Sequence, residues 1–280
     1  SNLLSAIAPT FSLLLATRVI TGTAAGIVNW LAWRHASRHP DAMGTVASIG
    51  PTTAAVASVI FGWAITAGGY PTVYLLLGLL PLAALFLPLS VDRSDRVGRE
   101  VSPSNSNRLL LGALGTMTLF GSALFIYVGL FFGVENGAPG WLLSWGLAAN
   151  AVAGMIGARS AMRSGGRWFV ATALSAFVMG VVSNIWLAAA GMVLWGLFFW
   201  FAVPAVLRLI EDYSRRAGER SGDAQAIMAV GRVIGPLLGG VLLAAGDQRL
   251  LGVVAGTGMT AGAVLILGVE RYRRRVRAWK

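Results

Sequence analysis

The 280-residue chain is 56% hydrophobic and 12% charged, with a mean hydropathy of +0.72. A soluble domain carries roughly a quarter charged residues, so this composition excludes a water-soluble globular fold. The net charge of +11 does not indicate nucleic-acid binding, because the arginines lie in short clusters between apolar runs. The chain has no cysteine, which excludes disulfides and thiolate metal sites.

Nine apolar runs are suitable for membrane-spanning helices, which need about 20 residues to cross a bilayer. Serine and asparagine at 183–184 separate the sixth run from the seventh, because one helix of their joint length would overshoot a bilayer. The sequence therefore predicts an all-α membrane protein. In chain order the runs cover residues 10–33, 43–67, 71–91, 109–133, 140–160, 168–184, 185–208, 224–245 and 249–269.

The connections between these runs alternate without a break between arginine-rich and arginine-poor. This alternation favours nine spans, because one miscounted span would put two arginine-rich loops on opposite sides of the membrane. The positive-inside rule places the rich loops and the C-terminus in the cytoplasm. We therefore expect a multi-pass protein of the bacterial cytoplasmic (inner) membrane.

The longest connection, 92–108, contains the polar stretch Ser102-Pro-Ser-Asn-Ser-Asn107 and is typical of a linker. It divides the chain into a partial N-terminal helical half, 1–91, and a C-terminal six-helix half with a basic tail, 109–280. Three predicted spans precede the linker and six follow it. If the two halves were once equal, three spans are missing from the front, and we expect the chain to be a fragment.

A Gly-Pro pair recurs in the second and eighth runs, at Gly50-Pro51 and Gly235-Pro236. Small residues at four-residue spacing let membrane helices approach closely, and proline bends a helix. Two such helices in equivalent places, six spans apart, are what a duplicated six-helix unit predicts. The eighth run carries the fuller pattern, which comprises Gly231, Arg232, Gly235, Pro236, Gly239 and Gly240.

These segments resemble the major facilitator superfamily of secondary transporters, in particular its drug–proton antiporter branch. In the first run, Arg18 followed by Thr21 and Gly22 is similar to the family's fourth-helix motif, with Thr21 where Gln is usual. The Gly-Pro helices resemble the antiporter motif of the fifth helix and its eleventh-helix copy. The loop 158–167 is similar to the family's loop between helices eight and nine, with Met162 in place of the usual Asp.

The resemblance implies that the chain comprises about helices four to twelve of a six-plus-six bundle. It also implies transport by alternating access, with proton-coupled efflux of a small molecule by a monomer that needs no cofactor. In the cytoplasmic loops, Arg167 belongs to the motif-like segment, and Arg163 is predicted to meet Glu211 or Asp212.

Ionisable residues inside a membrane span are functional candidates by default. Arg18 either faces the central cavity, for proton coupling or anion binding, or bonds structurally to backbone carbonyls. Arg232 is either a structural or gate residue or a ligand of the substrate. Polar and aromatic side chains of the spans complete the predicted substrate and proton pathway. They are Asn29, Thr116, Phe120, Tyr127, Asn150, Trp195 and Phe199.

Other classes of function fit less well. An enzyme is not predicted, because the spans lack a mid-span His or Asp cluster and the chain lacks a phosphate-binding loop. No metal site is predicted, since the neighbouring His35 and His39 have no carboxylate cluster beside them. Two alternatives remain open: uptake or exchange of a small organic anion, and a membrane protein that serves structure or partner binding without transporting.

Overall fold

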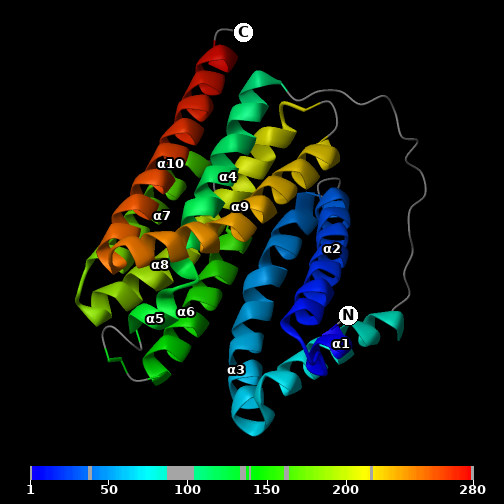
Figure 1. The fold of residues 1–280 in the computed structure, drawn as a ribbon. Coiled ribbons are helices and arrows are strands. Elements are labelled where there is room, and N and C mark those ends of the chain that lie inside the picture. Colours follow the sequence, from blue (N-terminus) through cyan, green and yellow to red (C-terminus); the bar gives the residue numbers. More distant parts are fainter. Residues whose placement is uncertain are drawn as a thin grey trace. The chain divides into compact units, whose positions relative to one another are not determined.

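The computed structural model describes residues 2–36, 40–86, 104–132, 137–138, 140–160, 164–214 and 217–278, which contain helices and no strand (Figure 1). Six helical segments of this described part are long and apolar enough to cross a membrane. They are Phe11–Trp33, Asn105–Leu130, Trp141–Arg159, Ile185–Glu211, Arg220–Ala245 and Gln248–Val276. Each of them matches one of the predicted spans, so the prediction of an all-helical membrane protein is confirmed.

The described residues of the other three predicted spans also lie largely in helical segments, and residues 87–91 of the third span lie outside the described part. The 43–67 and 71–91 runs fall on one long helix, α3 (Pro40–Leu79), and on the 3-10 helix η1 (Leu80–Phe86) that follows it. The α3 backbone breaks at Gly68 and Gly69, where Gly69 has a φ of 71° that only glycine adopts readily. The 168–184 run is the 17-residue α7 (Gly165–Val181). The count of nine spans stays a prediction.

The chain forms two compact units, residues 1–29 with 57–102 and residues 30–56 with 103–280. The first unit contains α1 (Asn2–Ala6) and shares α2 (Phe11–Ala36) and α3 with the second. The second unit also contains the six-helix bundle. Its six long helices are α4 (Asn105–Phe125), α6 (Gly140–Arg159), α7, α8 (Ile185–Glu211), α9 (Ala217–Ala245) and α10 (Gln248–Ala278). The short α5 (Val128–Leu130) follows α4.

The helices of the bundle pack in an order that differs from the chain order. α4 lies between α9 and α10, α7 lies between α10 and α8, and α6 packs on α8. The core between them is apolar, with fully buried side chains on α4, α7, α8 and α10. The α4–α9 and α6–α8 pairs frame the pocket described below.

Side-chain caps define where two of the helices begin. The Ser104 hydroxyl accepts the Asn107 backbone N–H at 3.3 Å, so α4 starts four residues before the predicted span. The Asn184 carboxamide oxygen accepts the N–H groups of Trp186 and Leu187 at 3.0 and 3.2 Å and caps α8. The predicted break between the sixth and seventh spans is confirmed at this position.

One face of α9 is apolar and exposed. Val233, Leu237 and Val241 follow one another at four-residue spacing, and about two-thirds of each side chain is accessible (70%, 69% and 66%). The glycines of α9 lie on the opposite face, because a shift of two residues turns a helix by roughly half a revolution. A bilayer or another apolar helix is the natural environment for such a stripe.

Helix ends that the loop charges assign to the same side of the membrane contact one another in the bundle. At one end, the buried Arg273 donates hydrogen bonds to the Leu209 carbonyl oxygen at 2.7 Å and to Asn107 Oδ1 at 2.6 Å. At the other end, Arg249 donates to the Ser183 hydroxyl at 3.0 Å. The first group contains only ends that were predicted to be cytoplasmic, and the second only ends that were predicted to lie outside.

Candidate functional site

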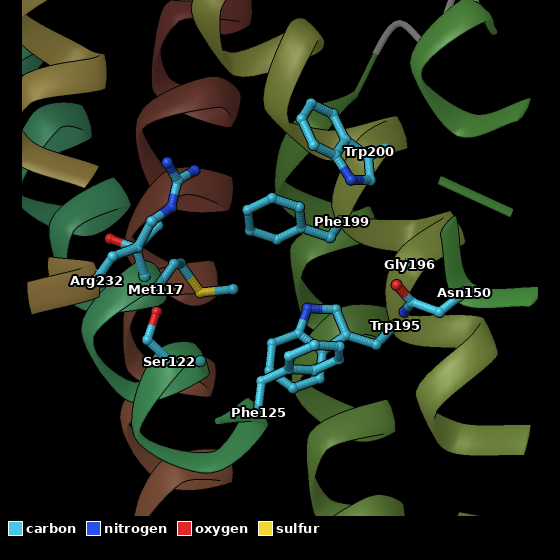
Figure 2. Close-up of a pocket in the computed structure, with 11 residues that line it drawn as sticks. Met117, Ser122, Phe125, Asn150, Trp195, Gly196, Phe199, Trp200 and Arg232 are labelled. Carbon is cyan, nitrogen blue, oxygen red and sulfur yellow. The ribbon is translucent and has the colours of Figure 1, made fainter. Parts of the chain in front are cut away.

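A pocket of about 190 Å³ opens within the six-helix bundle (Figure 2). Four helices contribute to its wall, and most of its lining residues are aromatic or small. From α4 come Met117, Thr118, Gly121, Ser122 and Phe125; from α6 comes Asn150; from α8 come Trp195, Gly196, Phe199 and Trp200; and from α9 comes Arg232.

Helical spacing explains why these side chains converge. On α4, Met117, Gly121 and Phe125 recur every fourth residue, and Trp195 and Phe199 do so on α8. Residues at this spacing share one face of a helix. Each helix therefore presents one face to the pocket, and Gly121 leaves room for the Trp195 ring, which lies 3.1 Å from where a Cβ atom would be.

The aromatic rings of the pocket hold one another in place. The Phe125 and Trp195 rings meet edge to face with centroids 4.9 Å apart, and the Phe199 and Trp200 rings do so at 5.8 Å. Phe199 also packs edge to face on the buried Phe169 of α7, at 5.9 Å. Such pairs fix ring orientation and form a preorganised apolar wall.

Asn150 lines the pocket and also links two helices. Its Nδ2 atom donates a hydrogen bond to the Met192 carbonyl oxygen on α8 at 2.6 Å. Gly196 permits this approach, since a Cβ atom there would lie 2.6 Å from the same nitrogen. The side chain thus positions α6 against α8 as well as facing the pocket.

Among the described residues that line this pocket, Arg232 is the only charged one. It lies near the middle of the Arg220–Ala245 span, and each end of that span is on the order of 18 Å away along the helix axis. Arg232 is exposed on the wall of the pocket, and that distance is longer than an arginine side chain. In Figure 2 its side chain and the Phe199 ring extend from opposite sides of the pocket.

The structure thus brings together three of the predicted pathway residues, Asn150, Trp195 and Phe199, and adds Arg232 to them. Three others do not line the pocket. Thr116 donates to the Gly112 carbonyl oxygen of its own helix at 3.0 Å, and the Phe120 ring packs on Gly258 of α10.

The third, Tyr127, donates its hydroxyl hydrogen to the Pro236 carbonyl oxygen of α9 at 2.8 Å. Asn29 is an exposed residue of α2, in the first unit. A Cβ atom at Gly22 of the same unit would meet nothing within 4 Å.

The glycines of the predicted antiporter motif form a close seam between α9 and α4. A Cβ atom at Gly231 would lie 2.8 Å from the Gly115 carbonyl oxygen, and one at Gly235 would lie 2.9 Å from the Ala123 backbone nitrogen. At Gly239 it would lie 2.7 Å from the Tyr127 ring. Real side chains do not fit at such distances, so glycine is required along this seam.

The equivalent motif in the second predicted span packs less tightly. A Cβ atom at Gly50 would make an ordinary contact of 3.6 Å with the Trp200 ring of the same unit. The adjacent Pro51 is buried. Gly240, beside the α9 seam, would bring a Cβ atom within 2.8 Å of the Tyr127 hydroxyl oxygen.

Arg18 lies in a polar cluster of the first unit. Its guanidinium donates to Asn2 Oδ1 at 2.5 Å and to the Ser5 hydroxyl at 2.7 Å, and it lies 4.7 Å above the Tyr74 ring centroid. Thr21, which takes the place of the usual Gln, accepts a longer bond of 3.4 Å. The described partners of Arg18 are all uncharged.

Of the predicted cytoplasmic-loop residues, Arg163 lies outside the described residues, so its predicted pairing with Glu211 or Asp212 is untested. Glu211 accepts a hydrogen bond from the buried Ser221 hydroxyl, which joins the end of α8 to the start of α9. The backbone of Asp212 ends α8, and the Arg167 guanidinium lies 5.4 Å above the Trp168 ring centroid.

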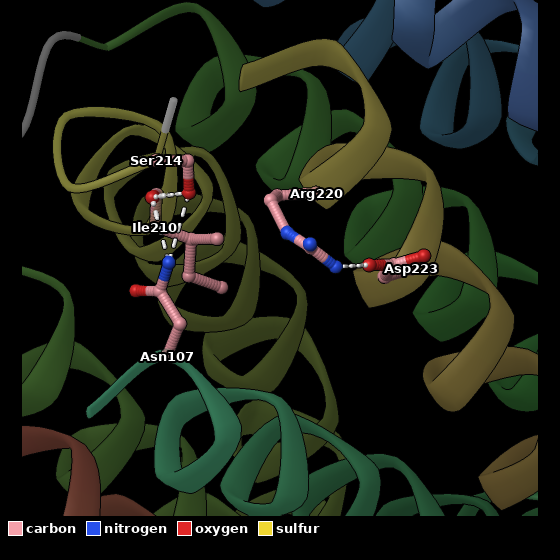
Figure 3. A network of polar contacts seen from close by, with 5 residues as sticks. All are labelled: Asn107, Ile210, Ser214, Arg220 and Asp223. Carbon is pink, nitrogen blue, oxygen red and sulfur yellow. Dashed lines mark hydrogen bonds and ion pairs between the residues drawn. The ribbon is translucent and has the colours of Figure 1, made fainter. Parts of the chain in front are cut away.

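Sequence reasoning missed a buried polar network at this end of the bundle. Asn107, only 1% exposed, donates to the Ser214 hydroxyl at 2.8 Å and to the Ile210 carbonyl oxygen at 3.3 Å (Figure 3). Arg273, 3% exposed, reaches Asn107 from α10. Arg273 is one arginine in a basic tail, and nothing in its sequence context sets it apart from its neighbours.

Glu270 adds a second connection from α10, again at the predicted cytoplasmic end. Its carboxylate accepts the Gly166 backbone N–H and the Ser164 hydroxyl, both at 3.1 Å, and pairs with Arg274 at 2.5 Å. A carboxylate at a helix N-terminus is stabilised by unpaired N–H groups and by the helix dipole. A single acid within a run of arginines was the available signal for this contact.

No protein-family model matches the chain. Curated relatives are the chloramphenicol efflux pumps of two strains of Mycobacterium tuberculosis. Each is 27% identical over 301 residues, which cover 91% of this chain and 70% of the relative. Together with the six apolar helices, this similarity identifies the chain as a multi-pass integral membrane protein similar to efflux pumps.

Proposed function

We propose that this chain belongs to a secondary active transporter of the major facilitator type that exports small drug-like molecules from the cytoplasm by proton antiport. The observation that carries the proposal is the aromatic pocket beside the glycine seam of α4 and α9. The curated relatives support the direction of transport, since both are named efflux pumps.

The seam supports alternating access for a physical reason. Close backbone approach without interdigitated side chains lets one helix shift on another without repacking a core. Pro236 has no N–H group to donate to the Arg232 carbonyl oxygen one turn earlier, which weakens α9 beside the pocket. A bend or shift of α9 there moves Arg232 relative to the wall formed by α8.

Proton coupling requires an ionisable group within the membrane helices. In the described membrane helices, acids occur only toward the helix ends, as with Glu211 and Asp223. Arg18, surrounded by neutral hydrogen-bond acceptors, is the candidate coupling residue of the first unit. A half-buried cation in a membrane helix favours a negative partner, either a substrate or a deprotonated carboxylate.

We place the protein in a bacterial inner membrane as a monomer, with its C-terminus in the cytoplasm. Substrate, protons and the lipid bilayer are then its partners. The basic residues of α10 beyond Glu270 lie at the end that the positive-inside rule assigns to the cytoplasm.

Efflux can be tested in bacterial cells that lack their own drug pumps. Cells that produce the full-length protein should accumulate several-fold less radiolabelled chloramphenicol than cells with an empty vector, and a protonophore should abolish the difference. Equal accumulation in both strains contradicts export of this drug, and efflux that persists with the protonophore contradicts proton coupling.

A variant pair tests the role of Arg18. Arg18→Ala should abolish efflux, whereas Arg275→Ala, which removes an exposed arginine of α10, should leave it unchanged. Unchanged efflux by Arg18→Ala at equal protein level removes Arg18 from the transport mechanism.

A further inference from the structure

The pocket has an unusual charge distribution for a drug-binding site. Arg232 is cationic, and the ten other lining residues are uncharged. Within the described residues Arg232 has no carboxylate or hydrogen-bond partner. A mid-membrane cation without a partner is costly, so the free energy of the site falls when a ligand supplies an acceptor or a negative charge.

The wall opposite Arg232 determines what else the ligand must carry. Trp195 and Phe199 extend from α8 toward the pocket, and Phe125 packs against Trp195 at 4.9 Å. Fixed rings of this kind favour a flat aromatic ligand through stacking and apolar contact. A lipophilic cation could also stack there by cation–π attraction, but the nearby Arg232 guanidinium would repel it.

The hydroxyl groups that line the pocket add little to its capacity to bind a cationic ligand. The Thr118 hydroxyl already donates to the Leu114 carbonyl oxygen at 3.0 Å, and Ser122 is the other hydroxyl of the lining. The Asn150 amide nitrogen is engaged with Met192. The pocket therefore has donors for an acceptor group, above all the guanidinium, and no carboxylate for a cation.

We propose that this pocket selects flat aromatic compounds that are neutral or anionic and carry an acceptor group, such as a nitro or carboxylate group, for Arg232, and that it rejects aromatic cations. Arg232 is then a specificity-determining residue, and this replaces the structural or gate role considered from the sequence. The inference rests on the proposed transport function and assigns its substrate class.

Three small aromatic probes of nearly equal shape allow a direct test: 4-nitrobenzoate, 4-nitrobenzyl alcohol and 4-nitrobenzylammonium. Binding to the purified full-length protein in detergent is measured by isothermal titration calorimetry. The anion and the alcohol should bind, and the ammonium compound should bind at least about tenfold more weakly, a difference of about 1.4 kcal/mol.

Substitutions at one position then separate charge from shape. Arg232→Lys retains the positive charge, so the ammonium compound should still bind more weakly than the anion and the alcohol. Arg232→Gln should abolish the advantage of the anion over the ammonium compound. Arg232→Glu should reverse the order, so that the ammonium compound binds more tightly than the anion. Arg275→Gln serves as the control, because it removes an exposed arginine outside the pocket. Thermal unfolding of each variant verifies folding, and the Lys and Gln pair suffices if the Glu variant does not fold.

Equal binding of all three probes by the wild type, or an order that survives Arg232→Gln, overturns the inference. The proposed function fails separately. If the protein exports chloramphenicol but the order of probe affinities does not depend on Arg232, only the role of Arg232 is refuted. The predicted affinity order in a protein that exports nothing refutes transport but leaves the ligand class in place.

Discussion

The hydroxyl group of Tyr127 donates a hydrogen bond to the carbonyl oxygen of Pro236, and the two oxygen atoms lie 2.8 Å apart. Tyr127 follows the end of α4, and Pro236 lies in the middle of α9. The contact therefore ties the bend-prone part of α9 to its neighbour. It also explains why Tyr127 is absent from the pocket lining, although its aromatic ring and its place in a membrane span favoured such a role.

Replacing Tyr127 with Phe removes this hydrogen bond and keeps the ring. We expect Tyr127→Phe to destabilise the protein by about 1 kcal/mol, the usual net value of one such bond. Thermal unfolding in detergent, followed by intrinsic fluorescence, measures the change. Thr116→Val is the control, because the Thr116 hydroxyl bonds only within its own helix; an equal loss in both variants would argue against a specific role of the Tyr127–Pro236 contact.

Adding a methyl group to the seam should have a larger effect. In Gly235→Ala, the new Cβ atom would lie 2.9 Å from the Ala123 backbone nitrogen, and backbone cannot move aside as a flexible side chain can. We expect a loss of about 1–3 kcal/mol, typical of overpacking, together with reduced efflux. Thermal unfolding and drug accumulation in cells measure the two effects.

Gly112→Ala is the matched control for this substitution. Gly112 lies on α4, and a Cβ atom there would meet nothing within 4 Å. Alanine is the better helix former, so this change should leave stability equal or raise it by up to about 1 kcal/mol. Similar destabilisation of both variants would mean that the close α4–α9 packing does not distinguish the two positions.

The sequence was informative where a single local rule decides the structure. Apolar length located six spans that the structure confirms, and the polar residues at 183–184 marked a helix boundary because Asn184 is a strong capping residue. Four-residue spacing of small residues correctly indicated close helix contact at Gly231 and Gly235. These signals are local, and tertiary packing does not alter them.

The pocket depended on information that the sequence lacks. Tyr127 and Trp195 both qualify as aromatic residues of a membrane helix, yet only Trp195 lines the pocket. The difference arises from which neighbour each helix face meets, and the packing order of the helices does not follow the chain order. For the same reason Arg273 was counted with the basic tail, although it is buried among the ends of α4 and α8.

That buried arginine leads to a stability prediction. Arg273→Met removes the bonds to the Leu209 carbonyl oxygen, at 2.7 Å, and to Ser106 and Asn107, both at 2.6 Å, and leaves these acceptors without this donor. We expect a loss of about 2–3 kcal/mol, in line with hydrogen bonds to a charged group. Arg271→Met, which removes an exposed arginine two residues away, should change the unfolding temperature little. If the two variants unfold alike, the Arg273 network contributes nothing to stability.

These 280 residues contain no cysteine, so a single thiol introduced into them can be labelled to measure the predicted sidedness. Ser183→Cys places a thiol at an exposed turn that was predicted to lie outside, and Asn105→Cys places one at the exposed start of α4, which was predicted to be cytoplasmic. In intact cells, a membrane-impermeant maleimide should label Ser183→Cys and not Asn105→Cys, and permeabilisation should expose both. Arginines at the Asn105 end favour retention in the cytoplasm during insertion, which gives the expected result its physical basis. Labelling of Asn105→Cys alone in intact cells would mean that the protein is inserted in the reverse orientation.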